Sequence, residues 1–419
     1  MTSPTVEPAA DRPVFDPFDP RWSSDPFPLY AELREHSPIH RNEMGFWVLA
    51  RHADCLAVLR DHRRASSEGM NMDEGGAPAR IRRPITGENP EAAGLVALRP
   101  FLFRDPPDHT RLRGLVAKAF TPKVVLSLRD RTQQVVDELL DAAMDADDVD
   151  LLAEFAYPLP VRVICDLLGV PLEDQDRFKR WSEALAQGLD PDFLLTDDVI
   201  EARGEAGMQF AQYFFELLTE RRRTPGADLL SRLVEVTDDG TVLTETEMLS
   251  TCILLLVAGH ETTVNLISGG VLALLRHPDQ LERFRTDPSV HRTGIEEMLR
   301  YVSPVQLTPR TFTEDCEFGG TEFGAGDFAM LLIGSANRDA AQFDDAERFD
   351  ITRTPNNHLG LGFGIHHCLG APLARMETEL ALTTLVRRAP KLALASDHVT
   401  YKPSVVLRGV ESLPVSMRG

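Results

Sequence analysis

Residues 358–375 read His-Leu-Gly-Leu-Gly-Phe-Gly-Ile-His-His-Cys-Leu-Gly-Ala-Pro-Leu-Ala-Arg, and this stretch decides the fold. Three glycines precede Cys368, and apolar residues then recur at helical spacing until Pro390 closes the run. Cys368 therefore lies just before a predicted helix N-terminus, where free N–H groups and the helix dipole favour a thiolate. The glycines allow a sharp turn and close approach to a flat partner. A thiolate presented in this way suits the axial ligand of an iron porphyrin.

Two other interpretations of Cys368 compete with that one. A cysteine is often only a small buried apolar residue. The triplet His366-His367-Cys368 could also suggest zinc, but a closed zinc site needs four ligands in paired spacings. The remaining cysteines stand alone in the sequence: Cys55, Cys165, Cys252 and Cys316. The flanking pattern favours the porphyrin ligand over both alternatives.

The composition describes an acidic chain with ample apolar content. Its 419 residues allow two or three domains, yet no linker, repeat or low-complexity block follows the N-terminal 20 residues, which we expect to be loose. The net charge of −21 argues against nucleic acid or an anionic membrane as a general partner. Five unpaired-looking cysteines suit a reducing cytoplasm. No signal peptide is recognisable, and the apolar run 253–259 is too short to span a bilayer.

A long central helix is predicted between a capping box at residues 244–247 and a stop at residues 276–278. About 32 residues would give a helix about 48 Å long. In its middle, an apolar run gives way to Ala258-Gly259-His260-Glu261-Thr262-Thr263. Glycine, acid and hydroxyl residues are costly in an apolar helix centre. They indicate either function or a kink where threonine bonds back to a carbonyl.

Weaker patterns surround these two centres. We expect a hairpin within residues 39–49, strands at residues 305–313 and 328–333, and short strands in the C-terminal tail. Residues 64–107 form a long irregular segment, typical of a lid or binding loop. Asp108 can cap a helix that carries His109 and Arg113 on one face, although such a pair is most often only solvated surface.

The Cys368 loop resembles the haem-binding signature of the cytochrome P-450 family, Phe-x-x-Gly-x-x-x-Cys-x-Gly. Gly364, Cys368 and Gly370 match it, and residues 371–375 are typical of soluble bacterial members. At the first position of this signature, Leu361 stands where the family has phenylalanine. This difference affects the expected tuning of the iron more than haem binding itself. The run 258–263 resembles the family's oxygen-activation motif, and the resemblance extends from about residue 28 to the end.

This resemblance implies a mainly α fold with a small β region (α+β), the single-domain cytochrome P-450 fold, over residues 21–419. It implies haem b (iron protoporphyrin IX) and a proton relay through Glu261 and Thr262. The residues expected to contact the haem are His109, Arg113, Ala258, Gly259, Arg310, Phe363, Gly364, His366, Cys368 and Gly370, with Cys368 as the iron ligand. Glu297, Arg300 and Arg348 are expected to form a structural ion-pair cluster.

The implied activity is monooxygenation with dioxygen and electrons from a ferredoxin and ferredoxin reductase, in a cytoplasmic monomer. The residues expected near the substrate are Leu95, Val96, Leu98, Leu255, Ala258, Val305, Gln306, Leu307, Val405 and Val406. Because almost all are apolar, they favour a neutral lipophile such as a steroid, terpenoid or macrolide-like ring, hydroxylated or epoxidised. Three arginines of the long loop could instead meet a carboxylate: Arg80, Arg82 and Arg83.

Two other functions stay open at this point: a haem-thiolate enzyme that uses peroxide, and a non-catalytic haem sensor or binding protein. A sensor has no need of a proton relay, and peroxide-using relatives often lack the acid–alcohol pair. For the electron donor, the candidate basic docking residues are Arg111, Lys118 and Lys123, with simple solvation as the alternative.

Overall fold

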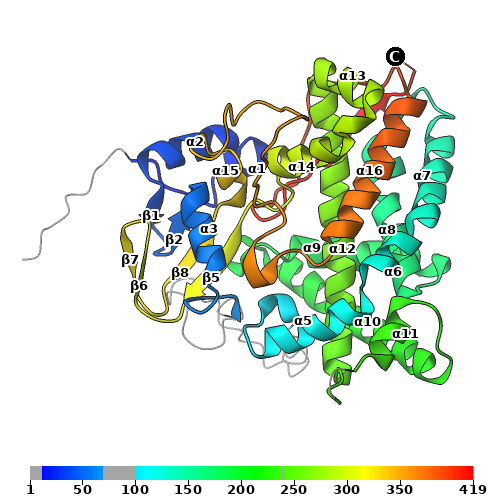
Figure 1. Ribbon diagram of the computed structural model, residues 1–419, viewed down its shortest axis with the longest axis horizontal. Helices are drawn as coiled ribbons and strands as arrows, with labels where there is room; N and C mark the ends of the chain where they lie inside the picture. The colour runs from blue at the N-terminus through cyan, green and yellow to red at the C-terminus, as the bar shows by residue number, and fades with distance from the viewer. Residues whose placement is uncertain (1–11, 69–99, 238–239, 419) are drawn as a thin grey trace, which may run out of the picture.

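The computed structural model describes residues 12–68, 100–237 and 240–418. Figure 1 shows long helices forming most of the molecule, with the main strands gathered on one side beside α2 and α3. The helices and helical turns are α1 (Arg21–Ser24), α2 (Phe27–His36), α3 (His52–Arg60), η2 (Phe101–Phe103), α5 (Asp108–Ala119), α6 (Pro122–Ser127), α7 (Arg129–Ala143), η3 (Leu152–Ala156), α8 (Pro158–Leu168), η4 (Leu172–Asp174), α9 (Gln175–Gln187), η5 (Asp192–Leu194), α10 (Asp197–Arg223), α11 (Leu229–Glu235), α12 (Glu245–Arg276), α13 (Pro278–Thr286), η6 (Pro288–Val290), α14 (His291–Val302), α15 (Ile333–Ala336), η7 (Gly364–His366) and α16 (Ala371–Arg388).

The main sheet has five strands in the order β1-β2-β8-β5-β3. The predicted hairpin is confirmed, since β1 and β2 pair antiparallel; β2 then pairs parallel with β8, and β8 antiparallel with β5. The strands are β1 (Ile39–Arg41), β2 (Trp47–Leu49), β3 (Ala65–Ser66), β4 (Asp148–Asp150), β5 (Thr308–Phe312), β6 (Cys316–Phe318), β7 (Thr321–Phe323), β8 (Phe328–Leu331), β9 (Ala393–Leu394) and β10 (Pro414–Ser416). Strands β4, β10 and β9 form a second small sheet.

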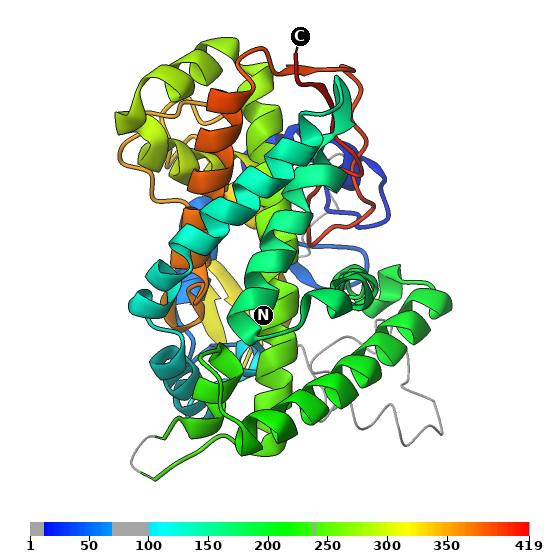
Figure 2. The same ribbon diagram turned by 90° about the vertical axis from the view of Figure 1, so that its right-hand side faces the viewer.

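Helix α12 organises the helical part and runs through its middle in both views (Figures 1 and 2). Its predicted capping box is confirmed: Thr244 accepts from the Glu247 N–H, and the Glu247 carboxylate accepts from the Thr244 N–H. The helix is apolar and long enough to cross a bilayer, which the run 253–259 alone did not suggest. However, 61% of its apolar window is buried against the other helices of the protein.

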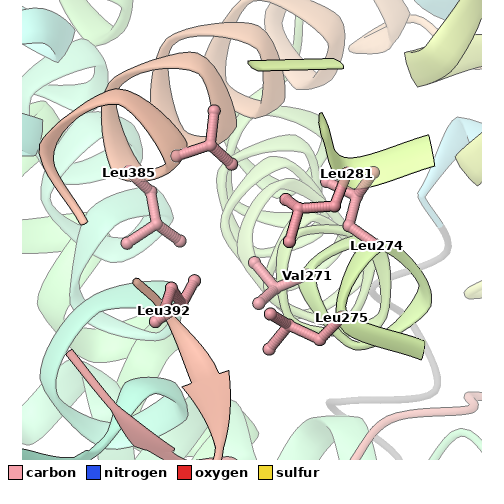
Figure 3. A pocket seen from close by; sticks show the side chains of 7 residues that line it. Val271, Leu274, Leu275, Leu281, Leu385 and Leu392 are labelled. Atoms are coloured by element: carbon pink, nitrogen blue, oxygen red, sulfur yellow. The ribbon is translucent and has the colours of Figure 1, made fainter. Parts of the chain in front are cut away.

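The C-terminal half of α12 packs into the apolar core. Figure 3 shows leucines and a valine of α12, α13 and α16 facing one another. These side chains, with Leu392, leave no room for a water molecule between them. Close packing of this kind fixes α12 relative to α16, the helix that follows Cys368.

Two boundaries differ from those predicted. The chain is anchored before residue 20, because the ring of Phe15 is buried and lies 4.6 Å from that of Trp22. The C-terminal tail forms two isolated bridges near residues 401–410, Val305 with Leu407 and Tyr401 with Val410, instead of a continuous ladder. The first of these bridges places the tail beside the segment that leads into β5.

Candidate active site

The loop before α16 is folded by its own backbone. The Cys368 N–H donates to the carbonyl of Leu361 at 2.8 Å. Gly362 and Gly364 have φ values of +68° and +69°, a region that side chains rarely adopt. A Cβ atom on Gly364 would also lie 2.7 Å from the carbonyl oxygen of Leu59. The expected sharp turn is therefore confirmed at these two glycines, whereas the close approach found here is that of Gly364 to the Leu59 backbone.

The half-buried Cys368 thiol lies at the N-terminus of α16. Burial raises its pKa, and this outweighs the N–H groups of Gly370 and Ala371 and the charges of Arg113 and Arg375, which lower it. The helix terminus therefore does not by itself produce a thiolate. A coordinated metal cation deprotonates a thiol outright, so this pKa is compatible with a thiolate ligand.

The zinc interpretation gains no support from the described part of the chain. No group of three or more His, Cys, Asp or Glu side chains there could hold a metal ion. All five cysteines are described, and all are unpaired. Phe363, also predicted to contact the cofactor, has 37% of its surface exposed and lies 5.0 Å from the guanidinium of Arg60.

Cationic and imidazole groups converge on one side of the Cys368 loop. The His109 and His366 rings lie 4.4 Å apart, and His366 Nε2 lies 3.1 Å from Ser67 Oγ. Both ring nitrogens of His109 and the Nδ1 of His366 are buried without a hydrogen-bond partner in the part of the chain that the structure describes. Burial, assisted by the charge of Arg310, lowers the pKa of His366 to about 3, so this ring is neutral.

Arg310 and Arg113 approach the same region from β5 and α5. Arg310 is buried, and its guanidinium donates to the carbonyl of its neighbour Pro309 at 2.7 Å. Burial lowers its pKa to about 10. Arg113 donates to the carbonyl of His367 at 2.6 Å. Within the described residues neither arginine forms an ion pair with a carboxylate, so this region can receive an anionic group.

The expected cap of α5 is wrong. Asp108 is the first helical residue, and Pro107 holds the cap position without a side-chain hydrogen bond. Arg111 is not a freely exposed docking charge, since Glu247 of α12 pairs with it. Lys118 and Lys123, the other two docking candidates, are exposed.

The residues of the polar run in the middle of α12 differ in their exposure to solvent. Ala258 is exposed and Thr262 half-buried, whereas His260 and Glu261 are buried. Thr262 Oγ donates to the Ala258 carbonyl at 2.8 Å, and Thr263 Oγ donates to Gly259 at 3.2 Å. The predicted back-bonding of threonine is therefore confirmed, on a helix whose Ala258 side is open.

Glu297 and Arg300 form the predicted ion pair, with both side chains fully buried and 2.7 Å between Nε and Oε2. The prediction that Arg348 is the third member of this ion-pair cluster is wrong. Arg353 supplies the second guanidinium, 3.2 Å from Glu297, while Arg348 contributes its carbonyl oxygen to Arg300 at 3.0 Å. The chain turns at Asp345, which has a positive φ, and the guanidinium that reaches Glu297 comes from Arg353.

The two apolar segments predicted to line the substrate site lie side by side. Gln306 N–H donates to the Val406 carbonyl at 2.8 Å, and Val305 pairs with Leu407. Leu307 is buried in a cluster against which Val405 and Val406 pack, while Leu255 packs half-buried against the larger core. Leu95, Val96, Leu98, Arg80, Arg82 and Arg83 lie outside the described residues.

One member of that set is corrected. Gln306 is the amide residue among those expected near the substrate, but its amide group is already occupied. Its oxygen accepts from Tyr30 Oη at 3.0 Å, and its nitrogen donates to the Ser303 carbonyl at 2.6 Å. The buried amide therefore braces the backbone and is not available to a ligand.

Three residues near the site escaped the sequence analysis. Lys402 forms an ion pair with Glu261, Asp190 binds the turn at residues 404–406, and Ser67 contacts His366. None lies in a recognisable motif. The only available signals were a lysine inside an otherwise apolar tail and an aspartate at a predicted helix break.

The residues present fit a haem. Buried imidazole nitrogens without partners and a buried arginine without a carboxylate match two propionate groups, which need charge-assisted donors. His109, Arg113, Arg310 and His366 would hold them. Cys368 would supply the axial thiolate, and Ala258, the exposed small residue of α12, would allow a flat group to approach.

Comparisons with known proteins agree with this arrangement. The profile of the cytochrome P450 family matches residues 98–389. Cytochrome P450 107B1 of Saccharopolyspora erythraea is 42% identical over 408 residues, which cover 95% of this chain and 96% of that protein. The 6-deoxyerythronolide B hydroxylase of the same organism is 38% identical over 415 residues, covering 96% and 98%.

Solved structures give the same result. The polyketide synthase cytochrome P450 PksS of Bacillus subtilis superposes with a TM-score of 0.87 at 37% identity, covering 97% of this chain and 100% of that one. CYP109E1 of Bacillus megaterium in complex with testosterone gives 0.81 at 33% identity, covering 94% and 100%.

Proposed function

Because the chain belongs to the cytochrome P450 family and is therefore a haem b monooxygenase, we propose that it hydroxylates or epoxidises a neutral, lipophilic small molecule of steroid, terpenoid or macrolide-like size. The observation that carries this proposal is the apolar pairing of residues 305–307 with residues 405–407. Gln306, the polar member, is turned into the protein. A charged ligand here would lose hydration at a cost of several kcal/mol without a partner.

The names of the relatives support the same class. One is a hydroxylase of 6-deoxyerythronolide B, and one structure holds testosterone. Both are bulky and uncharged, so burial of apolar surface would supply most of the affinity. An acidic ligand remains the competing outcome for the experiment below.

In the proposed mechanism the protein would hold the haem. Cys368 would provide the thiolate, and His109, Arg113, Arg310 and His366 would bind the propionates. The bound haem supplies dioxygen activation, in which one oxygen atom enters the substrate and the other leaves as water. Ala258 and Gly259 leave space beside the α12 backbone, and Thr262 presents its hydroxyl from the same side of the helix.

Glu261 and Thr262 would move protons. Thr262 Oγ is accessible and already donates to the Ala258 carbonyl, so it can accept a hydrogen bond from water. Glu261 is adjacent in sequence, with its Oε2 buried and without a partner. A carboxylate and a hydroxyl in sequence along the helix can pass a proton through one water to the reacting oxygen.

Electrons would come from a separate ferredoxin and ferredoxin reductase, in a cytoplasmic monomer. A basic patch on this acidic chain would lie near α5 and α6, where Lys118 and Lys123 are exposed. Reduction by a ferredoxin should then slow with added salt and in the Lys118→Glu variant. Reduction that is indifferent to both changes would exclude this docking surface.

The substrate class is tested by titrating matched neutral and acidic ligands, such as a steroid alcohol and its carboxylate, while following the haem spin state. We expect the neutral member to bind more tightly. Tighter binding of carboxylates, lost in Arg82→Ala or Arg83→Ala, would contradict the proposal. Product formation with the reductase system and with peroxide alone, measured side by side, separates a monooxygenase from a peroxide-using enzyme.

A further inference from the structure

The carboxylate of Glu261 is held by one cation. Only 3% of Glu261 is exposed, and its Oε1 accepts from Lys402 Nζ at 2.5 Å. The other oxygen lies 3.8 Å from His260 Nε2, but His260 Nδ1 is bound to the Leu256 carbonyl at 2.8 Å. Burial lowers the pKa of His260 and favours its neutral form. Lys402 is therefore the charge that compensates Glu261.

Lys402 reaches Glu261 from a turn far away in the sequence. The base of this turn is closed by the Lys402 N–H to the Gly409 carbonyl, at 2.9 Å, and by pairing of Tyr401 with Val410. The Lys402 side chain keeps 32% of its surface exposed. The same lysine thus contacts both the buried carboxylate and solvent.

The tip of the turn is fixed by a different element. Asp190, between α9 and η5, accepts from Ser404 Oγ at 2.8 Å and from the N–H groups of Val406 and Val405 at 3.0 and 3.3 Å. Asp190 is itself buried. The two valines pack in the cluster that contains Phe193 and Leu307. The apolar tip of the turn and the lysine at its base therefore belong to one rigid unit.

The turn also borders a large cavity of about 660 Å³ along α12. Tyr401 and Gly409 line it, together with Asn265, one helical turn beyond Glu261. Both amide atoms of Asn265 are buried and lack partners among the described residues. Buried polar groups of this kind bind ordered water where there is room for it. We therefore expect water in this cavity, one helical turn from Glu261.

We propose that Lys402 is a positioning residue for the reaction: its ammonium group holds and orients the buried Glu261 carboxylate, and Asp190 keeps Lys402 in place by holding the turn. The inference rests on the proposed relay role of Glu261. A buried carboxylate without a cation is driven toward its neutral, protonated form. Because the same turn carries both Lys402 and the two apolar valines at its tip, it links the proposed substrate side of the site to Glu261.

Infrared spectroscopy of the haem-loaded enzyme tests the first part without relying on turnover. In Lys402→Met we expect a new carbonyl stretching band of a protonated, buried carboxylic acid at neutral pH. The band should vanish in Lys402→Met/Glu261→Gln and be absent in Lys402→Arg, which restores the cation. If the band does not appear, Lys402 does not hold Glu261 ionised. Lys402→Gln, which keeps a donor without the charge, gives the same test if the methionine variant does not fold.

Coupling of electrons to product tests the second part. Lys402→Met should yield about tenfold less product per electron and release hydrogen peroxide, since displacement of a reacting group by about 1 Å can cost up to about 100-fold. Lys402→Arg should restore most of the yield. Lys391→Met, the same change at an exposed lysine, is the matched control and should behave as wild type. Unchanged coupling in Lys402→Met would overturn the proposal.

Asp190→Ala examines the link through the turn. It should reproduce the infrared band and part of the uncoupling, and Asp190→Ala/Lys402→Met should be no worse than Lys402→Met alone. Additive losses would show that Asp190 acts independently of Lys402. Glu261→Gln separates the relay role of Glu261 from the positioning role of Lys402. If this variant remains fully coupled, the relay role fails. The infrared result still decides whether Lys402 controls that carboxylate.

Discussion

Glu261 and Glu297 are both buried glutamates, but their carboxylates are satisfied to very different degrees. Glu297 is 0% exposed, and its carboxylate accepts hydrogen bonds from Nε and Nη2 of Arg300, at 2.7 and 2.8 Å, and from Arg353 and Asn356. Among the residues that the structure describes, Glu261 has one hydrogen-bond partner, Lys402, and its other oxygen has none. A fully satisfied buried network fixes structure, whereas a partly satisfied one leaves bonding capacity for water or ligand.

The arginines repeat this contrast. Arg300 donates to Glu297 and to three backbone carbonyls. Arg310 is equally part of the interior, yet its guanidinium bonds only to its own strand within the described residues. We infer that the Glu297 region stabilises the polypeptide itself, and we propose that a bound haem would complete the Arg310 region.

The largest expected effect is the loss of the satisfied cluster. Arg300→Leu leaves the Glu297 carboxylate buried with a single guanidinium neighbour, and removing one partner of a buried ion pair costs about 3–5 kcal/mol. Urea unfolding of the haem-loaded variant should show this loss, or no folded protein should be recovered. Unfolding at the wild-type midpoint would remove the distinction between the two regions.

Next in size is the effect at the relay. Thr262→Ala removes the hydroxyl without creating an unpaired buried charge, so we expect little change in stability. Product per electron should fall by about 100-fold, as general acid–base groups contribute at least that much. Reductant consumption and hydrogen peroxide are the quantities to measure. Full coupling here, and in Glu261→Gln, would refute the relay.

A smaller effect is expected at Arg310. Arg310→Leu removes a charge that lacks a protein carboxylate, so the haem-free protein should be no less stable than wild type. Haem should bind about tenfold more weakly, because hydrogen bonds to charged groups contribute about 1.5–3 kcal/mol. Transfer of haem to apomyoglobin measures the second quantity. A haem-free variant as unstable as Arg300→Leu would contradict the comparison.

The smallest effect concerns the loop itself. Leu361 accepts the Cys368 N–H and stands where the family has phenylalanine. A ring beside the sulfur would change access of water and hydrogen-bond donors, so Leu361→Phe should shift the haem reduction potential while leaving stability nearly unchanged. Redox titration compares the two proteins. An identical potential would mean that this position does not tune the iron.

Local signals predicted much of this molecule. The capping box that begins α12, the glycine turns before Cys368 and the hairpin of β1 and β2 all depend on neighbours in sequence. Contacts between distant segments were not predictable in the same way. The parallel pairing of β2 with β8 joins residues 47 and 329, and Lys402 meets Glu261 across 141 positions.

Errors in the predicted site have the same origin. Choosing Arg348 as the partner of Glu297 followed a motif, but the path of the chain after Asp345 brings Arg353 into contact. Gln306 was expected near the substrate, yet its side-chain oxygen accepts a hydrogen bond from Tyr30, at the other end of the sequence. Spacing identifies which residue types are available, and tertiary packing decides which of them face the ligand.

The central claim is that Cys368 presents a thiolate to haem iron, and the spectrum of the reduced protein with carbon monoxide tests it most directly. Wild type should show the strongly red-shifted Soret band of thiolate-bound haem. Cys368→His should lose that band while retaining haem, and Cys316→Ser, at another partly exposed cysteine, should keep it. An unchanged spectrum in Cys368→His or Cys368→Ser would contradict the account.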